Sequence, residues 1–154
     1  MEKGYLIFLE SADKNLKAAD HLLYITYPVI KDNKIFIKIF ELIHRAVRDS
    51  ISAALLYDYS LKKIEMQKSF NENFEVFRRN FESYNITREE IMLIEEIFHV
   101  MDKHNSSALE FVRKQKFVIM DDGLELQEIN INKLKNYLIL SKNLFDKVEK
   151  RLEA

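Results

Sequence analysis

Two Glu-x-x-His segments stand out among the residues that could bind a metal or move a proton. They are ELIH at positions 41–44 and EIFH at positions 96–99. In a four-helix bundle, two such pairs on separate helices hold a pair of metal ions, together with one carboxylate from each of the other two helices. The pattern therefore makes Glu41, His44, Glu96 and His99 candidate ligands of a di-metal carboxylate site.

The directions of these four residues around their helices argue against a shared metal. At about 100° per residue, Glu41 lies roughly 160° and His44 roughly 100° from the centre of the apolar face. On the second helix, Glu96 and His99 both lie more than roughly 130° from that centre. Metal ligands of a bundle point inward, so we expect no metal and no cofactor. A ferritin-like di-metal protein remains an alternative.

Basic residues form the second kind of candidate site. The segment EFVRKQKFV places Arg113, Lys114 and Lys116 between phenylalanines, and Arg78 and Arg79 form a smaller basic point. Basic residues interleaved with aromatic ones bind phosphates and stack on bases. We therefore keep these five residues as a candidate anion or nucleic-acid patch. The alternative is a helix-to-strand junction with inward phenylalanines and outward charges.

The composition excludes several other chemistries. The chain has no cysteine, which excludes disulfides and thiol catalysis and fits a reducing, cytoplasmic compartment. Two glycines are too few for a glycine-rich phosphate loop. The net charge of −1 gives no global field toward nucleic acid or an anionic membrane, and we expect no membrane partner. No residue combination indicates a catalytic site, so we favour a non-enzymatic role.

The scarcity of turn residues decides the fold class. An all-β domain needs turn residues every ten or so positions, and this chain has only two glycines and one proline. A length of 154 residues suits one domain with one core. We predict an all-α, up-and-down bundle of about five helices, formed by residues 1–154 as a single domain. A small β-hairpin precedes the C-terminal helix.

Apolar periodicity and capping residues place the helices. Pro28 should end the first helix, because the residue before a proline is pushed out of the α region. Thr87 and Glu90 form a capping box, and Asn130 or Asn132 should cap the last helix. The helices are expected at about residues 3–27, 34–64, 69–84, 87–104 and 130–152.

Two further patterns fix the remaining elements. Asp122-Gly123 separates two β-prone runs and predicts a hairpin of residues 116–120 with 124–129. The third helix carries an aromatic seam with spacings of four and three residues, which we expect in the bundle core. The seam consists of Phe70, Phe74, Phe77, Phe81 and Tyr84.

A family resemblance covers most of the chain. The run AADHLLYITYPVIKDNKIFIKIFELIHRAV, with EFVRKQKFVIMDD further along, resembles a family of small uncharacterised archaeal proteins. The helical layout is similar in a general way to HEPN domains, compact bundles that often dimerise. Ribonucleases of that class use an Arg-x(4–6)-His motif, and here no arginine has a histidine at that spacing. The resemblance implies a helical bundle but carries over no catalytic residue. It keeps an HEPN-like RNA-binding or RNA-processing domain as an alternative function.

The apolar surface of the second helix predicts self-association. Besides its core face, this helix carries Leu42 on one flank and Ile37, Ile51 and Leu55 on the other. A helix that is apolar over so wide an arc must be covered on several sides. Neighbouring helices of a monomeric bundle could provide this cover, but we favour a symmetric homodimer. We therefore expect a non-enzymatic interaction or scaffold protein that acts as a homodimer.

Overall fold

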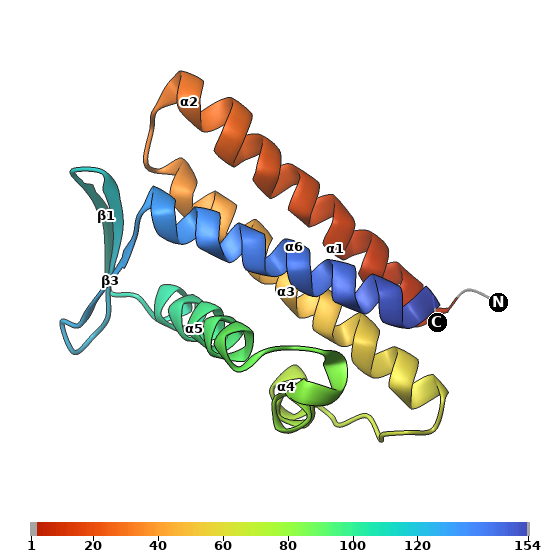
Figure 1. Ribbon diagram of the computed structural model, residues 1–154. Coiled ribbons are helices and arrows are strands. Elements are labelled where there is room, and N and C mark those ends of the chain that lie inside the picture. The colour runs from red at the N-terminus through yellow and green to blue at the C-terminus, as the bar shows by residue number, and fades with distance from the viewer. Residues whose placement is uncertain (1–2, 154) are drawn as a thin grey trace.

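The computed structural model describes residues 3–153, which form a mainly helical protein with a small antiparallel sheet (Figure 1). The long helices are α1 (Gly4–His21), α3 (Ile35–Ser60) and α6 (Ile131–Glu153), and α3 contacts both of the others. The helices α4 (Phe70–Arg79) and α5 (Arg88–Asn105) also pack against α3. The sheet precedes α6 in the chain. The predicted fold class is therefore confirmed.

The first helix does not end at Pro28, contrary to the prediction. It continues through a π-helical turn, η1 (Leu22–Thr26), into the short helix α2 (Tyr27–Ile30). A proline inside an α-helix lacks an N–H and clashes with the carbonyl four residues earlier. Here the Tyr27 N–H bonds to the Leu22 carbonyl, five residues back, and Pro28 lies in the first turn of α2. The wider turn removes the clash, and the first turn of a helix tolerates proline.

Close packing around α3 depends on small side chains. Where two helices present alanine or serine to each other, their backbones approach closely and leave no cavity. Each of the three long helices contributes such residues to the centre of the molecule. The following are fully buried: Ala12, Ala19, Ala46, Ser50, Ala53, Ala54 and Ser141.

The wide apolar arc of α3 is covered within the single chain. Ile51 and Leu55 are fully buried, Leu42 is nearly so, and Ile37 is partly buried against the core. The covering elements are α1, α4, α5 and α6. The reason for which a dimer was expected is therefore wrong, because these flanks of α3 face other helices. A charged residue at Ile51 would unfold the protein rather than separate two copies.

The end of α3 lies four residues before the predicted one. Lys62 adopts a left-handed conformation (φ 59°), and the Lys63 N–H bonds to the Asp58 carbonyl at 2.9 Å. This bond, from a residue to the carbonyl five before it, is typical of a helix ended by a left-handed residue. Glycine is the usual residue at such a position. Because a lysine stands there instead, the end of the helix could not be recognised in the sequence.

The aromatic seam lies partly in the core. Phe77 is fully buried, whereas Phe70, Phe74 and Phe81 are half-buried against the core. Phe81 belongs to a separate 3-10 helix, η2 (Phe81–Tyr84), because α4 ends at Arg79. Tyr84, the last residue of the seam, is also buried. The predicted core position is therefore confirmed in full for Phe77 and Tyr84 and in part for the other three residues.

Local capping signals were correct. The Glu90 N–H donates to Thr87 Oγ1 at 3.1 Å, and the Thr87 N–H donates to Glu90 Oε1 at 2.9 Å, which completes the capping box of α5. Asn130 caps α6 by accepting the Lys133 N–H at 2.8 Å. Both signals act within four residues, so the tertiary structure does not alter them.

The sheet has three strands rather than the predicted two. The strands β2 (Lys116–Met120) and β3 (Leu126–Ile129) form the predicted hairpin, and β1 (Leu109–Arg113) pairs antiparallel on the other side of β2. The missed turn between β1 and β2 has Lys114 in a left-handed conformation (φ 56°). Hairpin turns of this kind usually carry asparagine or glycine, neither of which is present.

Only one face of this sheet joins the bundle. Successive residues of a strand point to opposite faces. Phe117, Ile119 and Ile129 share the face that packs into the main core. The sheet is also attached to α5 by polar contacts: Lys103 Nζ lies 2.6 Å from Asp121 Oδ2, and His104 Nδ1 lies 2.5 Å from Glu110 Oε1.

Candidate functional site

Of the two Glu-x-x-His segments, the structure brings together the histidines but not the glutamates. His44 of α3 and His99 of α5 line one groove, which is bounded by α3, α4 and α5. Glu96 accepts a hydrogen bond from the buried Tyr137 hydroxyl of α6 instead, and Glu41 does not line the groove. Within residues 3–153, no three histidine or carboxylate side chains are grouped so that they could hold a metal ion.

Aromatic side chains form one wall of this groove, which has a volume of about 420 Å³. The Phe98 ring of α5 packs edge-on against Phe70 and Phe74 of α4, with ring centroids 5.5 Å and 4.8 Å apart. The His44 imidazole stands at 88° to the Phe98 ring, with centroids 5.3 Å apart. Such edge-to-face contacts fix the orientations of the rings. His44 is therefore held by aromatic packing.

Charged side chains of both signs border the groove. The Arg48 guanidinium lies 4.5 Å from the centre of the Phe70 ring, and it forms no ion pair among the described residues. Arg78 binds both carboxylate oxygens of Glu75, which lowers the pKa of that carboxyl well below its usual range. Glu95 and Asp102 of α5 stand nearby. Because carboxylates stand beside the arginines, the groove is not a strong anion-binding site.

Burial lowers the pKa of His44 to about 4, and the neighbouring charges of Arg48 and Arg45 act in the same direction. A histidine in this environment is neutral at pH 7. It can then accept a hydrogen bond, or a proton, from a ligand in the groove. The helical-wheel angle of His44 predicted a position outside the bundle, because the wheel describes α3 alone. It could not show that Phe98 of α5 packs against His44.

Acidification should destabilise the protein through His44. Its pKa is near 6.5 in the unfolded chain and about 4 in the folded one, so the unfolded state takes up the proton first. Between pH 6.5 and 4 the free energy of unfolding should fall, with a contribution from His44 on the order of 3 kcal/mol. Urea unfolding at several pH values measures this effect. The free energy of unfolding should fall less on acidification for His44→Gln than for the parent protein.

His99→Gln is the matched control, since His99 lies in the same groove but is exposed. It shows how much of any change comes from replacing an imidazole by an amide in this groove. Equal slopes for His44→Gln and the parent would contradict a buried, neutral His44.

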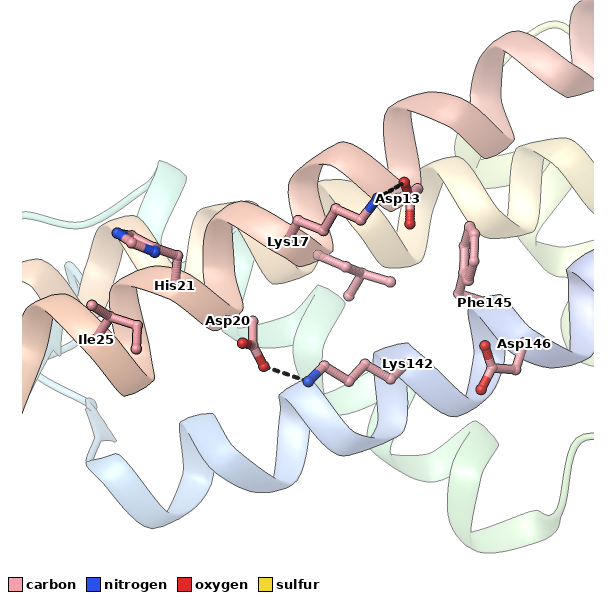
Figure 2. Close-up of a pocket in the computed structure, with 9 residues that line it drawn as sticks. Asp13, Lys17, Asp20, His21, Ile25, Lys142, Phe145 and Asp146 are labelled. Carbon is pink, nitrogen blue, oxygen red and sulfur yellow. Dashed lines mark hydrogen bonds and ion pairs between the residues drawn. The ribbon is translucent and has the colours of Figure 1, made fainter.

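A second cleft separates α1 from α6 and has a volume of about 520 Å³ (Figure 2). Lys142 of α6 forms an ion pair with Asp20 of α1, and Lys17 lies 2.8 Å from Asp13 on α1 itself. Figure 2 shows the Asp20–Lys142 pair crossing the space between the two helices, with His21 near one end. The two lysines are thus occupied by carboxylates. His21 and Asp146 also line the cleft, but Figure 2 shows them at opposite ends of it, so they do not converge on one point.

The predicted basic patch is divided between two places. Arg78 and Arg79 lie on α4, where both contact Glu75. Arg113, Lys114 and Lys116 lie at the turn between β1 and β2, at the far end of the molecule from α4 (Figure 1). The five residues therefore do not form one surface. Of the strand residues, Lys116 is paired with Glu128 at 2.9 Å.

The outer face of the sheet is a site that the sequence analysis missed. By strand alternation, the residues opposite the core face are largely apolar. We call these residues the outer sheet face: Leu109, Phe111, Val118, Met120 and Leu126. Leu109 and Leu126 on the two outer strands are exposed, Phe111 and Met120 are half-buried, and Val118 on the central strand is only 2% exposed. The alternation of apolar and polar residues at positions 109–111 was the available signal of a strand. It indicates an outer apolar face only once β1 is known to pair with β2.

Comparisons with known proteins assign no function to these sites. No family model, no curated protein and no solved structure matches this chain. No helix within the described part of the chain is long and apolar enough to cross a membrane.

Proposed function

We propose that this protein is a non-enzymatic interaction protein that forms a homodimer through its outer sheet face. The observation that supports the proposal is the apolar composition of that face on a sheet whose opposite face already packs on the core. Leu109 is 54% exposed and Leu126 is 47% exposed. An antiparallel sheet commonly buries one face and presents a polar one to water. A sheet that is apolar on both faces indicates a surface that another molecule covers.

The charges at one end of the face are compatible with a second copy of the chain. Arg113 and Lys116 share the outer side with Glu128, so both signs of charge are present. In a two-fold interface a patch meets itself, and a patch with both signs can pair across the axis. Two outer faces packed together would resemble the sheet-on-sheet packing of ordinary protein cores. A stable dimer should bury more than roughly 1,000 Å² in total, which requires neighbouring loop residues as well.

The oligomeric state provides the test. Light scattering at micromolar concentration should give about twice the chain mass of 18.4 kDa. The double variant Leu109→Lys/Leu126→Lys should be monomeric, with a dissociation constant raised by at least about 100-fold, because each lysine would be buried without a partner. Both positions are exposed in the single chain, so the variant should keep the helical circular dichroism of the parent.

Met92→Lys/Ile139→Lys is the matched control. These two residues are as exposed as the first pair but lie on α5 and α6. This variant should remain dimeric. A mass of 18.4 kDa for the parent protein would refute the dimer. A dimer that survives the two lysines on the sheet would place the interface elsewhere.

A further inference from the structure

Exposed aliphatic side chains gather where the first helical segment ends. Val29 of α2 is 81% exposed, Ile30 beside it is 53% exposed, and Ile25 of η1 is 58% exposed. Figure 1 shows α2 at one extremity of the molecule, with the chain turning back there toward α3. Ile25 also lines the cleft between α1 and α6, whereas Val29 and Ile30 of α2 line neither that cleft nor the groove bounded by α3, α4 and α5. We call this end, with the loop of residues 31–34 and the β1–β2 turn, the tip.

Two hydrogen bonds join the parts of the tip. The Tyr27 hydroxyl donates to Asn33 Oδ1 at 2.8 Å, and Asn33 Nδ2 donates to the Lys114 carbonyl at 3.0 Å. The Asn33 side chain therefore links α2 to the β1–β2 turn. This link places part of the basic segment predicted from the sequence next to the aliphatic residues of α2.

The cations of the tip are not neutralised. Lys31, Lys34 and Lys114 are exposed, and none of them forms an ion pair within the described chain. Arg113 is exposed as well, but its charge acts on Glu128 and helps to lower the pKa of that carboxyl. The loop contributes a single carboxylate, Asp32, which accepts the Lys34 backbone N–H. The tip is therefore both aliphatic and cationic, although the whole chain has a net charge of −1.

We propose that the tip docks on an anionic lipid surface. Aliphatic side chains enter the boundary between headgroups and acyl chains, and lysine or arginine beside them pairs with lipid phosphates. Peripheral contact of this kind needs no membrane-spanning helix. The proposal replaces the expectation of no membrane partner with a local contact, because the assembled tip gathers cations that the net charge of −1 does not reveal.

Two other occupants fit the tip less well. A second copy would bring cations against the same cations across a two-fold axis, which is repulsive. Single-stranded nucleic acid would use aromatic rings for stacking, but the projecting residues of α2 are aliphatic. Tyr24 of η1 does expose its aromatic ring, but Lys135 Nζ lies 5.9 Å from the centre of that ring.

Vesicle co-sedimentation tests the proposal on the full chain. The protein should sediment with vesicles of phosphatidylglycerol and phosphatidylcholine in equal amounts, and not with phosphatidylcholine alone. Added salt should weaken the binding. Val29→Asp/Ile30→Asp should weaken it by at least about tenfold, since it removes the inserted groups and adds negative charge. Lys31→Glu/Lys114→Glu should weaken it on the order of tenfold per reversed charge.

Met92→Asp/Ile139→Asp, exposed apolar positions on other elements, should bind vesicles as the parent does. Equal sedimentation with anionic and neutral vesicles, or none with either, would overturn the proposal. So would binding that the tip variants leave unchanged. A salt-dependent shift of mixed RNA oligomers that the lysine variants abolish, without vesicle binding, would make the tip an RNA site instead. These results are independent of the dimer, because mass measurements on the tip variants report that state separately.

Discussion

Phe77→Ala is expected to lower the free energy of unfolding by about 3–5 kcal/mol. Phe77 is fully buried, and its ring stacks on Tyr84 with a centroid distance of 4.9 Å and on Phe74 at 6.3 Å. Its removal leaves a cavity between α4 and η2 that the surrounding rigid rings cannot fill. Urea unfolding followed by circular dichroism measures the change.

Met92→Ala is the control for this prediction, because Met92 is a large apolar residue of α5 that is 62% exposed. It should change the stability by less than about 0.5 kcal/mol. An unfolding midpoint for Phe77→Ala equal to that of the parent would show that α4 contributes little to the core. That result would turn attention to the seam as a functional surface.

Asp58→Ala is expected to destabilise the protein by about 3 kcal/mol or more, because it leaves a charge without its buried partner. Asp58, near the end of α3, is almost fully buried. Its carboxylate accepts hydrogen bonds from Arg151 Nη2 at 3.0 Å and 3.1 Å and from the Tyr84 hydroxyl at 2.7 Å. The Arg151 guanidinium also lies 4.5 Å from the centre of the Tyr84 ring. This cluster joins α3, η2 and α6.

A double-mutant cycle isolates the ion pair. Adding Arg151→Met to Asp58→Ala should restore part of the lost stability, since it removes the arginine left unpaired. Lys142→Met is the matched control, because it breaks the exposed pair with Asp20 and should cost less than about 1 kcal/mol. If Asp58→Ala and Lys142→Met cost the same, the Asp58 cluster would not be a structural anchor. Strict additivity of the two cluster variants would also contradict the coupling.

The ion pair could not be predicted from the sequence, although both residues were visible in it. Asp58 and Arg151 are 93 positions apart, and only the packing of α6 along α3 brings them together. The same holds for His44 and His99, which share a groove because α5 crosses α3 at that level. Helical-wheel angles describe one helix at a time, so they could not show this convergence. They also placed Ile51 and Leu55 on a free flank that other helices in fact cover.

The sequence by itself determined the features that depend on residues close together in the chain. Few glycines and prolines allow long helices, Thr87 with Glu90 starts α5, and Asn130 starts α6. These effects arise within one helical turn, so they do not depend on distant partners. The β2–β3 hairpin was likewise marked by its own turn residues.

Only the tertiary structure decided the features that depend on long-range contacts or on unusual backbone conformations. The strand β1 forms because β2 is available to pair with it, across a turn in which a lysine takes a left-handed conformation. The helical segment continues past Pro28 because the π-helical turn before it removes the steric clash of the proline ring. The outer sheet face and the tip exist as surfaces only after strands and loops have been assembled. A one-dimensional pattern shows which residues are apolar or charged, whereas the packing of distant elements decides which of them remain exposed.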